Sequence, residues 1–363
     1  MKKLRFAALG AAAALTLGAC GSAPSDSGSS ASPAASGSSD FVACMVSDAG
    51  GIDDRSFNAN AYKGVQDAVA QFGIQEKFLE SKSQTDYAPN INSLVNDNCG
   101  IIITVGFLME DATKQAAQDN AEEKFAIVDA ASDPKIDNMK GLVFNTAQSS
   151  FLAGYLAAGM SQTGKVATFG GLPIPSVTAF MDGYWEGVQY YNEQNGTNVE
   201  VLGWDMNSPD SGSFAGGFDD QAKGQQLAKN FIQQGADIIL PVAGPVGLGA
   251  AKEAQSTGKA DIIWVDSDGY ESAPQYKDVF LTSVLKKIDV AVTDTIGETI
   301  DGNFSSEEYV GTLENDGTGL APFHDFESQV PQELKDQLEQ IRQGIIDGSI
   351  EITSPNQPGA SAS

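Results

Sequence analysis

The chain has 363 residues, and its 21 basic and 48 acidic side chains give a formal net charge of −27 at pH 7. A chain this acidic is expected not to bind nucleic acid and not to dock electrostatically on anionic lipid. Its single histidine, and three cysteines without a Cys-x-x-Cys motif, predict neither a metal site nor a cofactor. The length suggests roughly two domains.

Residues 1–20 have the composition of a secretory signal. Three basic residues stand near the start, an apolar stretch covers residues 6–17, and Leu17-Gly18-Ala19-Cys20 follows. This order resembles a bacterial lipobox, which implies cleavage before Cys20 and diacylation of its thiol. An ordinary signal peptide with an incidental cysteine is the alternative. The resemblance predicts a protein anchored to the cell membrane through a lipid on Cys20, on the extracytoplasmic face.

Low-complexity segments flank the expected globular part. Residues 21–40 are almost entirely Ser, Gly, Ala and Pro, and the end of the chain has a similar composition. Such segments cannot bury enough apolar surface to fold. The sequence therefore predicts a disordered tether at 21–40, a disordered tail at 353–363, and folded structure between residues 41 and 352.

Short apolar runs alternate with amphipathic segments through the part expected to fold. The expected strands are 41–46, 77–80, 101–105, 124–128, 141–144, 165–169, 200–202, 238–242, 262–265 and 279–281. The expected helices are 62–72, 88–97, 112–120, 149–160, 179–193, 220–234, 248–257 and 288–299. This alternation is typical of parallel sheets with helices on both faces, so the predicted fold class is α/β with two Rossmann-like halves.

Two cysteines remain in the part expected to fold. Cys44 lies in the first expected strand, and Cys99 lies just before the strand at 101–105. In a doubly wound sheet of order 2-1-3 these two strands are neighbours, so a disulfide between Cys44 and Cys99 is geometrically plausible in an exported protein. Two buried free thiols are the alternative.

The first expected strand is followed by the run Asp48-Ala49-Gly50-Gly51-Ile52-Asp53-Asp54-Arg55-Ser56-Phe57-Asn58. In a parallel α/β sheet such a loop lies at the carboxyl end of a strand, where ligands bind. It offers a carboxylate in Asp48, an aromatic face in Phe57 and an amide in Asn58. These groups suit recognition of a small molecule, and the loop contains no catalytic nucleophile.

Three further strand ends carry residues of a similar kind. Asp129 ends the strand at 124–128, Gly244 lies in the glycine-rich turn after 238–242, and Asp266 ends the strand at 262–265. Backbone N–H groups at such a turn can bind a ligand oxygen, but no Lys-Ser/Thr pair follows to make a phosphate loop. Carboxylates at three strand ends favour a neutral ligand with hydroxyl or ring N–H donors. Helix capping is the structural alternative for each of them.

Two phenylalanines and a lysine complete the candidate site. Phe57 and Phe180 come from opposite halves of the chain and could stack on both sides of a flat base. Lys286 could add a cation beside a ribose. The alternatives are ordinary core packing for the two rings and a solvated position for the lysine.

No arrangement of residues favours an enzyme. The only imidazole belongs to His324, no serine lies in a Gly-x-Ser-x-Gly elbow, and no paired glutamates suggest glycoside hydrolysis. The sequence predicts a binding protein without catalytic residues, in which His324 is structural or on the surface.

A set of motifs in fixed order resembles the basic membrane lipoprotein family, the substrate-binding lipoproteins of ABC transporters. The match spans about residues 41–352. It rests on the run from Asp48 to Asn58 followed by Ala61-Tyr62-x-Gly64, and then on Gly170-Gly171-x-Pro173, Phe180-x-x-Gly183, Phe218-Asp219-x-x-Ala222-Lys223-Gly224, Gly235-Ala236-Asp237, Val265-Asp266-x-Asp268, Thr282-Ser283-Val284-x-Lys286, Gly311-x-Leu313 and Gly319-Leu320-Ala321.

This resemblance implies a type I periplasmic binding fold that captures a purine nucleoside. Carried over by motif, Asp48, Asn58 and Asp129 are expected to contact the base, with Phe57 and Phe180 stacking on it. The ribose hydroxyls are expected to be held by Asp266, Lys286 and the backbone at Gly244. Compared with the family pattern, this chain has Asp53 where asparagine is frequent and Pro245 where glycine is common.

The resemblance also implies two lobes joined by hinge strands. The N-terminal lobe is expected to contain residues 41–145 and about 268–310, and the C-terminal lobe residues 146–267 and about 311–352. Ligand binding would close the lobes. A monomer is expected, with an ABC permease and its ATPase as partners. The alternatives are a receptor for a sugar or furanose-type signal, a surface sensor lipoprotein without a transport role and, more remotely, a secreted nucleoside hydrolase.

Overall fold

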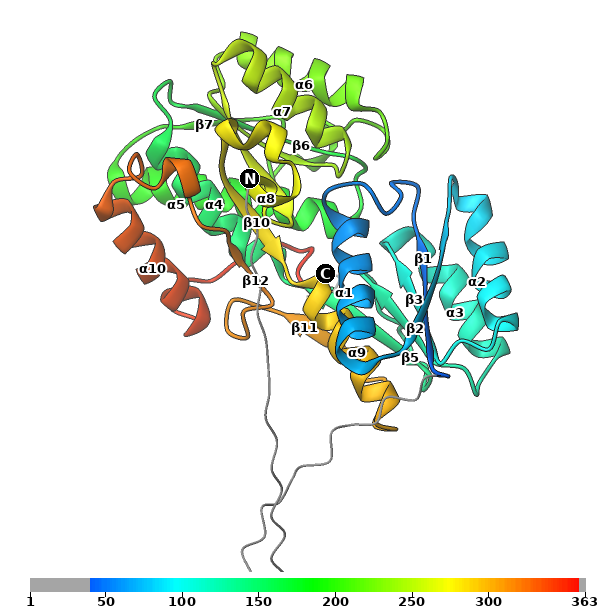
Figure 1. Cartoon of the computed structure of the whole chain (residues 1–363). Coiled ribbons are helices and arrows are strands. Elements are labelled where there is room, and N and C mark those ends of the chain that lie inside the picture. Colours follow the sequence, from blue (N-terminus) through cyan, green and yellow to red (C-terminus); the bar gives the residue numbers. More distant parts are fainter. Residues whose placement is uncertain (1–39, 359–363) are drawn as a thin grey trace, which may run out of the picture. The chain divides into compact units, whose positions relative to one another are not determined.

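The computed structural model describes residues 40–358, which form two α/β lobes (Figure 1). The signal peptide, Cys20 and nearly all of the tether lie outside the described residues. The sheet of the N-terminal lobe has the strand order β11-β5-β4-β3-β1-β2, and that of the C-terminal lobe has the order β12-β10-β9-β8-β6-β7. All strand pairs are parallel except β10 with β12. The two doubly wound sheets confirm the predicted fold class.

The N-terminal lobe contains the first five strands, and the chain returns to it later to add a sixth. Its strands are β1 (Val42–Ser47), β2 (Gln75–Glu80), β3 (Ile101–Val105), β4 (Phe125–Val128), β5 (Met139–Phe144) and β11 (Tyr309–Gly311). Its helices are α1 (Phe57–Phe72), α2 (Tyr87–Asn96), α3 (Glu110–Asp119) and α9 (Ile288–Ile300). Successive residues of β1 enter different cores, because a strand alternates its side chains between faces: Ala43 and Met45 pack under α1 and α9, and Cys44 and Val46 pack under α2 and α3.

The C-terminal lobe has the same plan. Its strands are β6 (Lys165–Gly170), β7 (Glu200–Leu202), β8 (Ile238–Val242), β9 (Asp261–Asp266), β10 (Phe280–Lys286) and β12 (Thr318–Leu320). Its helices are α4 (Thr146–Met160), α5 (Pro175–Asn195), α6 (Gln221–Gln233), α7 (Val246–Thr257), α8 (Gly269–Ser272) and α10 (Gln332–Ile346). Helices α4, α5 and α10 cover one face of the sheet, and α6 and α7 cover the other.

The chain returns to the N-terminal lobe later than expected. Residues from 268 onward were expected there, but β10 pairs with β9 in the C-terminal sheet, and the crossing follows at Lys287, just before α9. The expected strand at 279–281 also proves too short. Thr282 and Ser283 are polar but only 2% and 1% exposed. Their hydroxyls can be buried because Thr282 donates to the carbonyl of Ala321 and Ser283 accepts from the N–H of Gly269.

Residues 353–357 are held by hydrogen bonds, although a disordered tail was expected from residue 353; residues 359–363 of that tail lie outside the described residues. Thr353 donates its backbone N–H and its hydroxyl to Glu186 of α5, and Ser354, which is 2% exposed, donates to Asp182 Oδ2 at 2.6 Å. Gln357 accepts from the Asn145 side chain between β5 and α4. Buried carboxylates on α5 therefore hold residues 353–357 in place, although the composition of the segment gives no sign of it.

The structure contains a disulfide between Cys44 and Cys99, whose Cα atoms are 5.9 Å apart. It joins β1 to the residue two places before β3. These strands are neighbours in the sheet, as the order 2-1-3 predicted.

Replacing both cysteines with alanine should lower the free energy of unfolding by about 4 kcal/mol, because the disulfide closes a loop with a sequence separation of 55. Urea unfolding of the wild type with and without dithiothreitol, beside the double variant, measures this effect. Reductant should destabilise the wild type and leave the variant unchanged. A loss below about 1 kcal/mol would contradict a stabilising disulfide.

Within residues 40–358, no helix is both long and apolar enough to cross a membrane.

Candidate functional site

The eight ligand-binding candidates from the sequence all line one cavity, to which both lobes contribute. The N-terminal lobe supplies Asp48, Phe57, Asn58 and Asp129, and the C-terminal lobe supplies Phe180, Gly244, Asp266 and Lys286. The cavity contains about 590 Å³ of space free of atoms, part of it open to solvent.

The loop after β1 places a carboxylate and an amide side by side. Asp48 Oδ1 accepts from Asn58 Nδ2 at 2.7 Å and from the backbone N–H of Gly50 at 3.0 Å. Burial raises the pKa of the Asp48 carboxyl, although these hydrogen bonds lower it. One carboxylate oxygen therefore orients Asn58, which leaves Oδ2 of Asp48 as the acceptor free of those two bonds.

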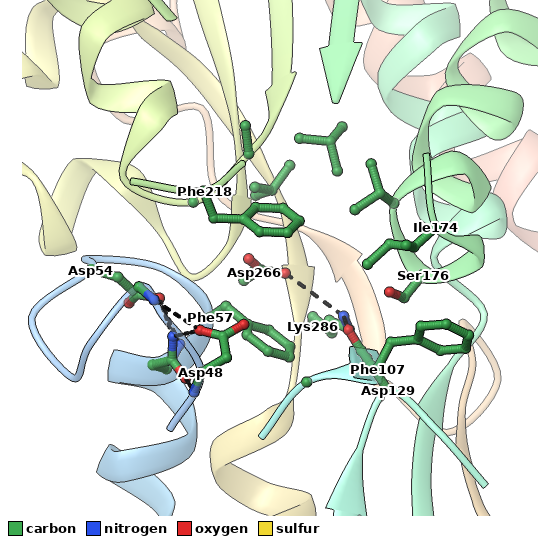
Figure 2. Close-up of a pocket in the computed structure, with 18 of the residues that line it drawn as sticks. Asp48, Asp54, Phe57, Phe107, Asp129, Ile174, Ser176, Phe218, Asp266 and Lys286 are labelled. Carbon is green, nitrogen blue, oxygen red and sulfur yellow. Dashed lines mark hydrogen bonds and ion pairs between the residues drawn. The ribbon is translucent and has the colours of Figure 1, made fainter. Parts of the chain in front are cut away.

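Asp54 is a cavity residue that the sequence reasoning missed. It accepts from the backbone N–H groups of Ser56, Asn58 and Ala59 at 2.7–2.9 Å and so caps the start of α1. Burial raises its pKa to about 6. Its neighbour Asp53 is exposed, and nothing in the sequence distinguishes the two aspartates. Figure 2 shows Asp54 beside Asp48 on the N-terminal side of the site.

Lys286, at the end of β10, is the cation of the site and lies between two carboxylates. Its Nζ is 2.6 Å from Asp129 Oδ2 and 3.9 Å from Asp266 Oδ1, and its side chain is only 3% exposed. Asp129 belongs to the N-terminal lobe, so the shorter ion pair crosses between the lobes (Figure 2). Burial raises the pKa of Asp129 to about 6, against the opposing effect of Lys286, and burial also raises the pKa of Asp266.

Three strand ends at the cavity carry a residue with a positive φ. Asp129 after β4, Asp266 at the end of β9 and Gly244 after β8 have φ values of 70°, 68° and 52°. A positive φ is uncommon for residues other than glycine, and the strain it brings persists where the surroundings hold the backbone in place. At Gly244 a Cβ would meet nothing within 4 Å, so the backbone there is open to a ligand.

Aromatic rings surround the ammonium group of Lys286. Its Nζ lies 4.9 Å from the ring centre of Phe57, 5.5 Å from that of Phe180 and 5.6 Å from that of Phe144. Such cation–π contacts help to compensate for the burial of a charge. They show that the two rings expected to stack on a base converge on one point, from α1 in one lobe and α5 in the other.

The C-terminal lobe and η2 (Phe107–Met109) supply further cavity residues that the sequence reasoning did not assign. Figure 2 shows Phe218, from the loop before α6, on the opposite side of Asp266 from Phe57. Phe107, Ile174 and Ser176 line another side. Phe218 was part of a noted motif, but a ring on a long loop gives no sign in the sequence of the direction in which it points.

His324 lies outside this cavity. Its Nε2 is 2.7 Å from Asp268 Oδ2, and its ring stacks on Tyr270 with centroids 4.1 Å apart. These contacts fit the expected structural role. No group of three or more His, Cys, Asp or Glu side chains in the described part of the chain could hold a metal ion.

The raised pKa of Asp129 predicts a pH dependence of stability. A carboxyl whose pKa is about 6 when folded and 3.8 when unfolded binds more protons in the folded state, so its contribution to stability is complete below pH 3.8 and is lost as the pH rises through 6. Urea unfolding at pH 4.5 and pH 7 should therefore show the stability of the wild type falling relative to Asp129→Asn, by at most about 3 kcal/mol. A difference between the two proteins that does not change with pH would contradict the raised pKa.

The chain is similar to known proteins over most of its length. Residues 41–355 match the family model described as Bmp, ABC transporter substrate-binding protein PnrA-like. The CD4+ T-cell-stimulating antigen of Listeria innocua is 31% identical over 380 aligned positions, which cover 99% of this chain and 100% of that protein. A Lactococcus lactis protein named ABC transporter nucleoside-binding protein BmpA is 30% identical, covering 87% of this chain and 90% of its own. The crystal structure of an ABC transporter solute-binding protein from Aeropyrum pernix K1 superposes with a TM-score of 0.78 at 27% identity, covering 87% of this chain and 94% of that one.

Proposed function

The chain belongs to the Bmp family of PnrA-like ABC transporter substrate-binding proteins, and from this premise we propose that its cavity captures a purine nucleoside for an ABC importer. Membership makes the chain a solute-binding component of a transporter, not an enzyme. The relative from Lactococcus lactis is named as a nucleoside-binding protein, which supports the choice of ligand.

One observation carries the proposal: four carboxylates line the cavity, and the only cation among its lining residues is already paired. Asp48, Asp54, Asp129 and Asp266 all line the cavity, and Lys286 lies within 4 Å of the last two. An anionic ligand in this cavity would find no unpaired positive charge, so nucleotides and carboxylic acids are disfavoured as ligands. A neutral molecule with several N–H and O–H donors suits such acceptors, and aromatic rings suit a flat heterocycle.

The arrangement supports a division of roles within the cavity. Asp48, Asn58 and Asp129 line the N-terminal side and would contact the base, which would stack on Phe57 and Phe180. The ribose would lie toward Asp266, Lys286 and the open backbone at Gly244. Closure of the lobes would bury the nucleoside, and the closed form would dock on the permease. Cys20 would carry the lipid that keeps the protein at the extracytoplasmic face of the cell membrane.

Native mass spectrometry of the purified chain, followed by thermal-shift measurements, tests the proposed ligand class. The panel comprises adenosine, guanosine, inosine, cytidine, uridine, the free bases and ribose. A co-purified purine nucleoside, or stabilisation by purine nucleosides above all other compounds, is the expected result. Stabilisation by sugars alone would favour a sugar receptor instead, and stabilisation by nothing in the panel would remove the nucleoside proposal.

Phe57→Ala should weaken nucleoside binding by about 1–3 kcal/mol, or roughly 5- to 150-fold in Kd, because it removes one stacking surface. Phe72→Ala is the matched control, since Phe72 is also partly buried and ends the same helix, α1, far from the cavity. Isothermal titration calorimetry with the best ligand of the panel measures both. Equal affinities for Phe57→Ala and the wild type would refute the stacking role.

A further inference from the structure

Two buried side chains of the N-terminal lobe contact the strand ends of the C-terminal lobe that carry Asp266 and Lys286. Ser56 stands just before α1 and is 0% exposed, and Asn60 lies in the first turn of α1 and is 8% exposed. Neither lines the cavity. Their partners stand more than 200 positions away in the sequence, so the contacts join segments that only the fold brings together.

Asn60 holds the ends of β9 and β10 at a fixed spacing. Its Nδ2 donates to the backbone carbonyl of Asp266 at 3.2 Å and to that of Lys286 at 2.7 Å. The two strands pair in parallel up to Leu285 and Asp266, so these carbonyls lie where the pairing of the strands ends. Asp266 also has the strained φ of 68°, which needs support from its surroundings. The amide of Asn60 uses both of its hydrogens to provide that support.

Ser56 fixes the direction of the Asp266 carboxylate. Its Oγ lies 2.6 Å from Asp266 Oδ2 and 3.1 Å from the carbonyl oxygen of Val265. With Oδ2 engaged, Oδ1 is the oxygen that lies 3.9 Å from Lys286 Nζ. This distance exceeds that of a direct hydrogen bond, so Oδ1 keeps capacity to accept from a ligand.

We propose that Asn60 and Ser56 are positioning residues that set the affinity of the cavity for the ribose hydroxyls. They act through the spacing and orientation of Asp266 and Lys286 and do not contact the ligand. The inference rests on the proposed function, because it takes the ligand to be a nucleoside whose sugar lies at Asp266 and Lys286. It also makes ligand discrimination depend on a contact between the lobes, which forms only when α1 lies against the ends of β9 and β10.

Asn60→Ala tests the inference through the preference for ribose over a sugar that lacks the 2′ and 3′ hydroxyls. Isothermal titration calorimetry would compare inosine with 2′,3′-dideoxyinosine on the wild type and on the variant. The wild type should prefer inosine, by roughly tenfold or more for the hydrogen bonds to charged groups that the analogue lacks. Asn60→Ala should lose most of this preference, with weaker inosine binding and little change for the dideoxy analogue, which a general loss of structure would not produce.

Asn138→Ala is the matched control. Asn138 is 6% exposed and donates its side-chain amide to three backbone carbonyls of the N-terminal lobe, those of Ala117, Asn120 and Glu123, and it does not line the cavity. This variant should lose thermal stability but keep the preference for inosine. If Asn60→Ala does not fold, Ser56→Ala carries the same test.

The outcomes separate this inference from the proposed function. If the wild type binds inosine in preference to its dideoxy analogue and Asn60→Ala keeps that preference within twofold, the positioning role is wrong while the nucleoside proposal stands. If inosine and the analogue lose affinity equally in Asn60→Ala, the residue supports the fold alone. If the wild type binds no nucleoside of the panel, the proposed function fails, and with it the assignment of ribose to Asp266 and Lys286.

Discussion

Lys286→Met should lower the free energy of unfolding at pH 7 by about 3–5 kcal/mol, because it leaves the buried carboxylates of Asp129 and Asp266 without their cation. Without Lys286, both carboxyls should bind protons at higher pH than in the wild type. The loss should therefore be smaller at pH 5 than at pH 7. Urea unfolding of both proteins at the two pH values measures this.

Lys140→Met is the control for that substitution. Lys140 is also a mostly buried lysine in an ion pair, with a side chain 9% exposed, but its partner Glu298 is 43% exposed and can be solvated when left alone. Its loss should cost clearly less than that of Lys286. Equal losses for the two variants, or a loss below about 1 kcal/mol for Lys286→Met, would contradict the view that Lys286 neutralises the site.

Asp266→Ala should weaken nucleoside binding by about 3 kcal/mol, or more than a hundredfold in Kd, because it removes the carboxylate that would accept from the ribose hydroxyls. The variant should still fold. In the variant, Lys286 retains its ion pair with Asp129, which is 2.6 Å long in the wild type. The Ser56 hydroxyl retains its hydrogen bond to the carbonyl of Val265. Alanine in the left-handed conformation of residue 266 adds a cost of about 1–2 kcal/mol to folding.

Asp261→Ala provides the comparison for Asp266→Ala. Asp261 begins the same strand, β9, and burial raises its pKa to about 6, but it does not line the cavity. Isothermal titration calorimetry should show wild-type affinity for Asp261→Ala and a large loss for Asp266→Ala. Retained affinity in Asp266→Ala would remove this residue from the site.

The sequence predicts much of the fold because buried parallel strands consist of continuous apolar runs. Each of the ten expected strands overlaps a strand of the structure. The short strands β11 and β12 went unpredicted, since three residues carry no periodicity, and the amphipathic helix α10 was overlooked. The end of β10 was misplaced because Thr282 and Ser283 are polar, and their burial depends on partners in other segments.

The candidate site was also predicted where local sequence suffices, and missed where a residue's role depends on partners far away in the sequence. Residues at strand ends could be placed together, because parallel strands meet at one edge of a sheet, and Asp48, Asp129, Gly244 and Asp266 do line one cavity. Residues whose roles depend on distant partners could not be found in this way. Asn60 has the sequence context of an ordinary helix residue, and only the fold brings it to the carbonyls of Asp266 and Lys286.

The most direct test of the central claim is a calorimetric titration of the wild-type chain with inosine, inosine 5′-monophosphate and ribose. The cavity, with its carboxylates, its paired lysine and its aromatic rings, predicts that one inosine binds per chain. The monophosphate should bind more weakly by roughly a hundredfold or more, because its charge finds no free cation, and ribose alone should not bind measurably. Monophosphate binding as tight as that of inosine, or ribose binding without any nucleoside binding, would contradict the account.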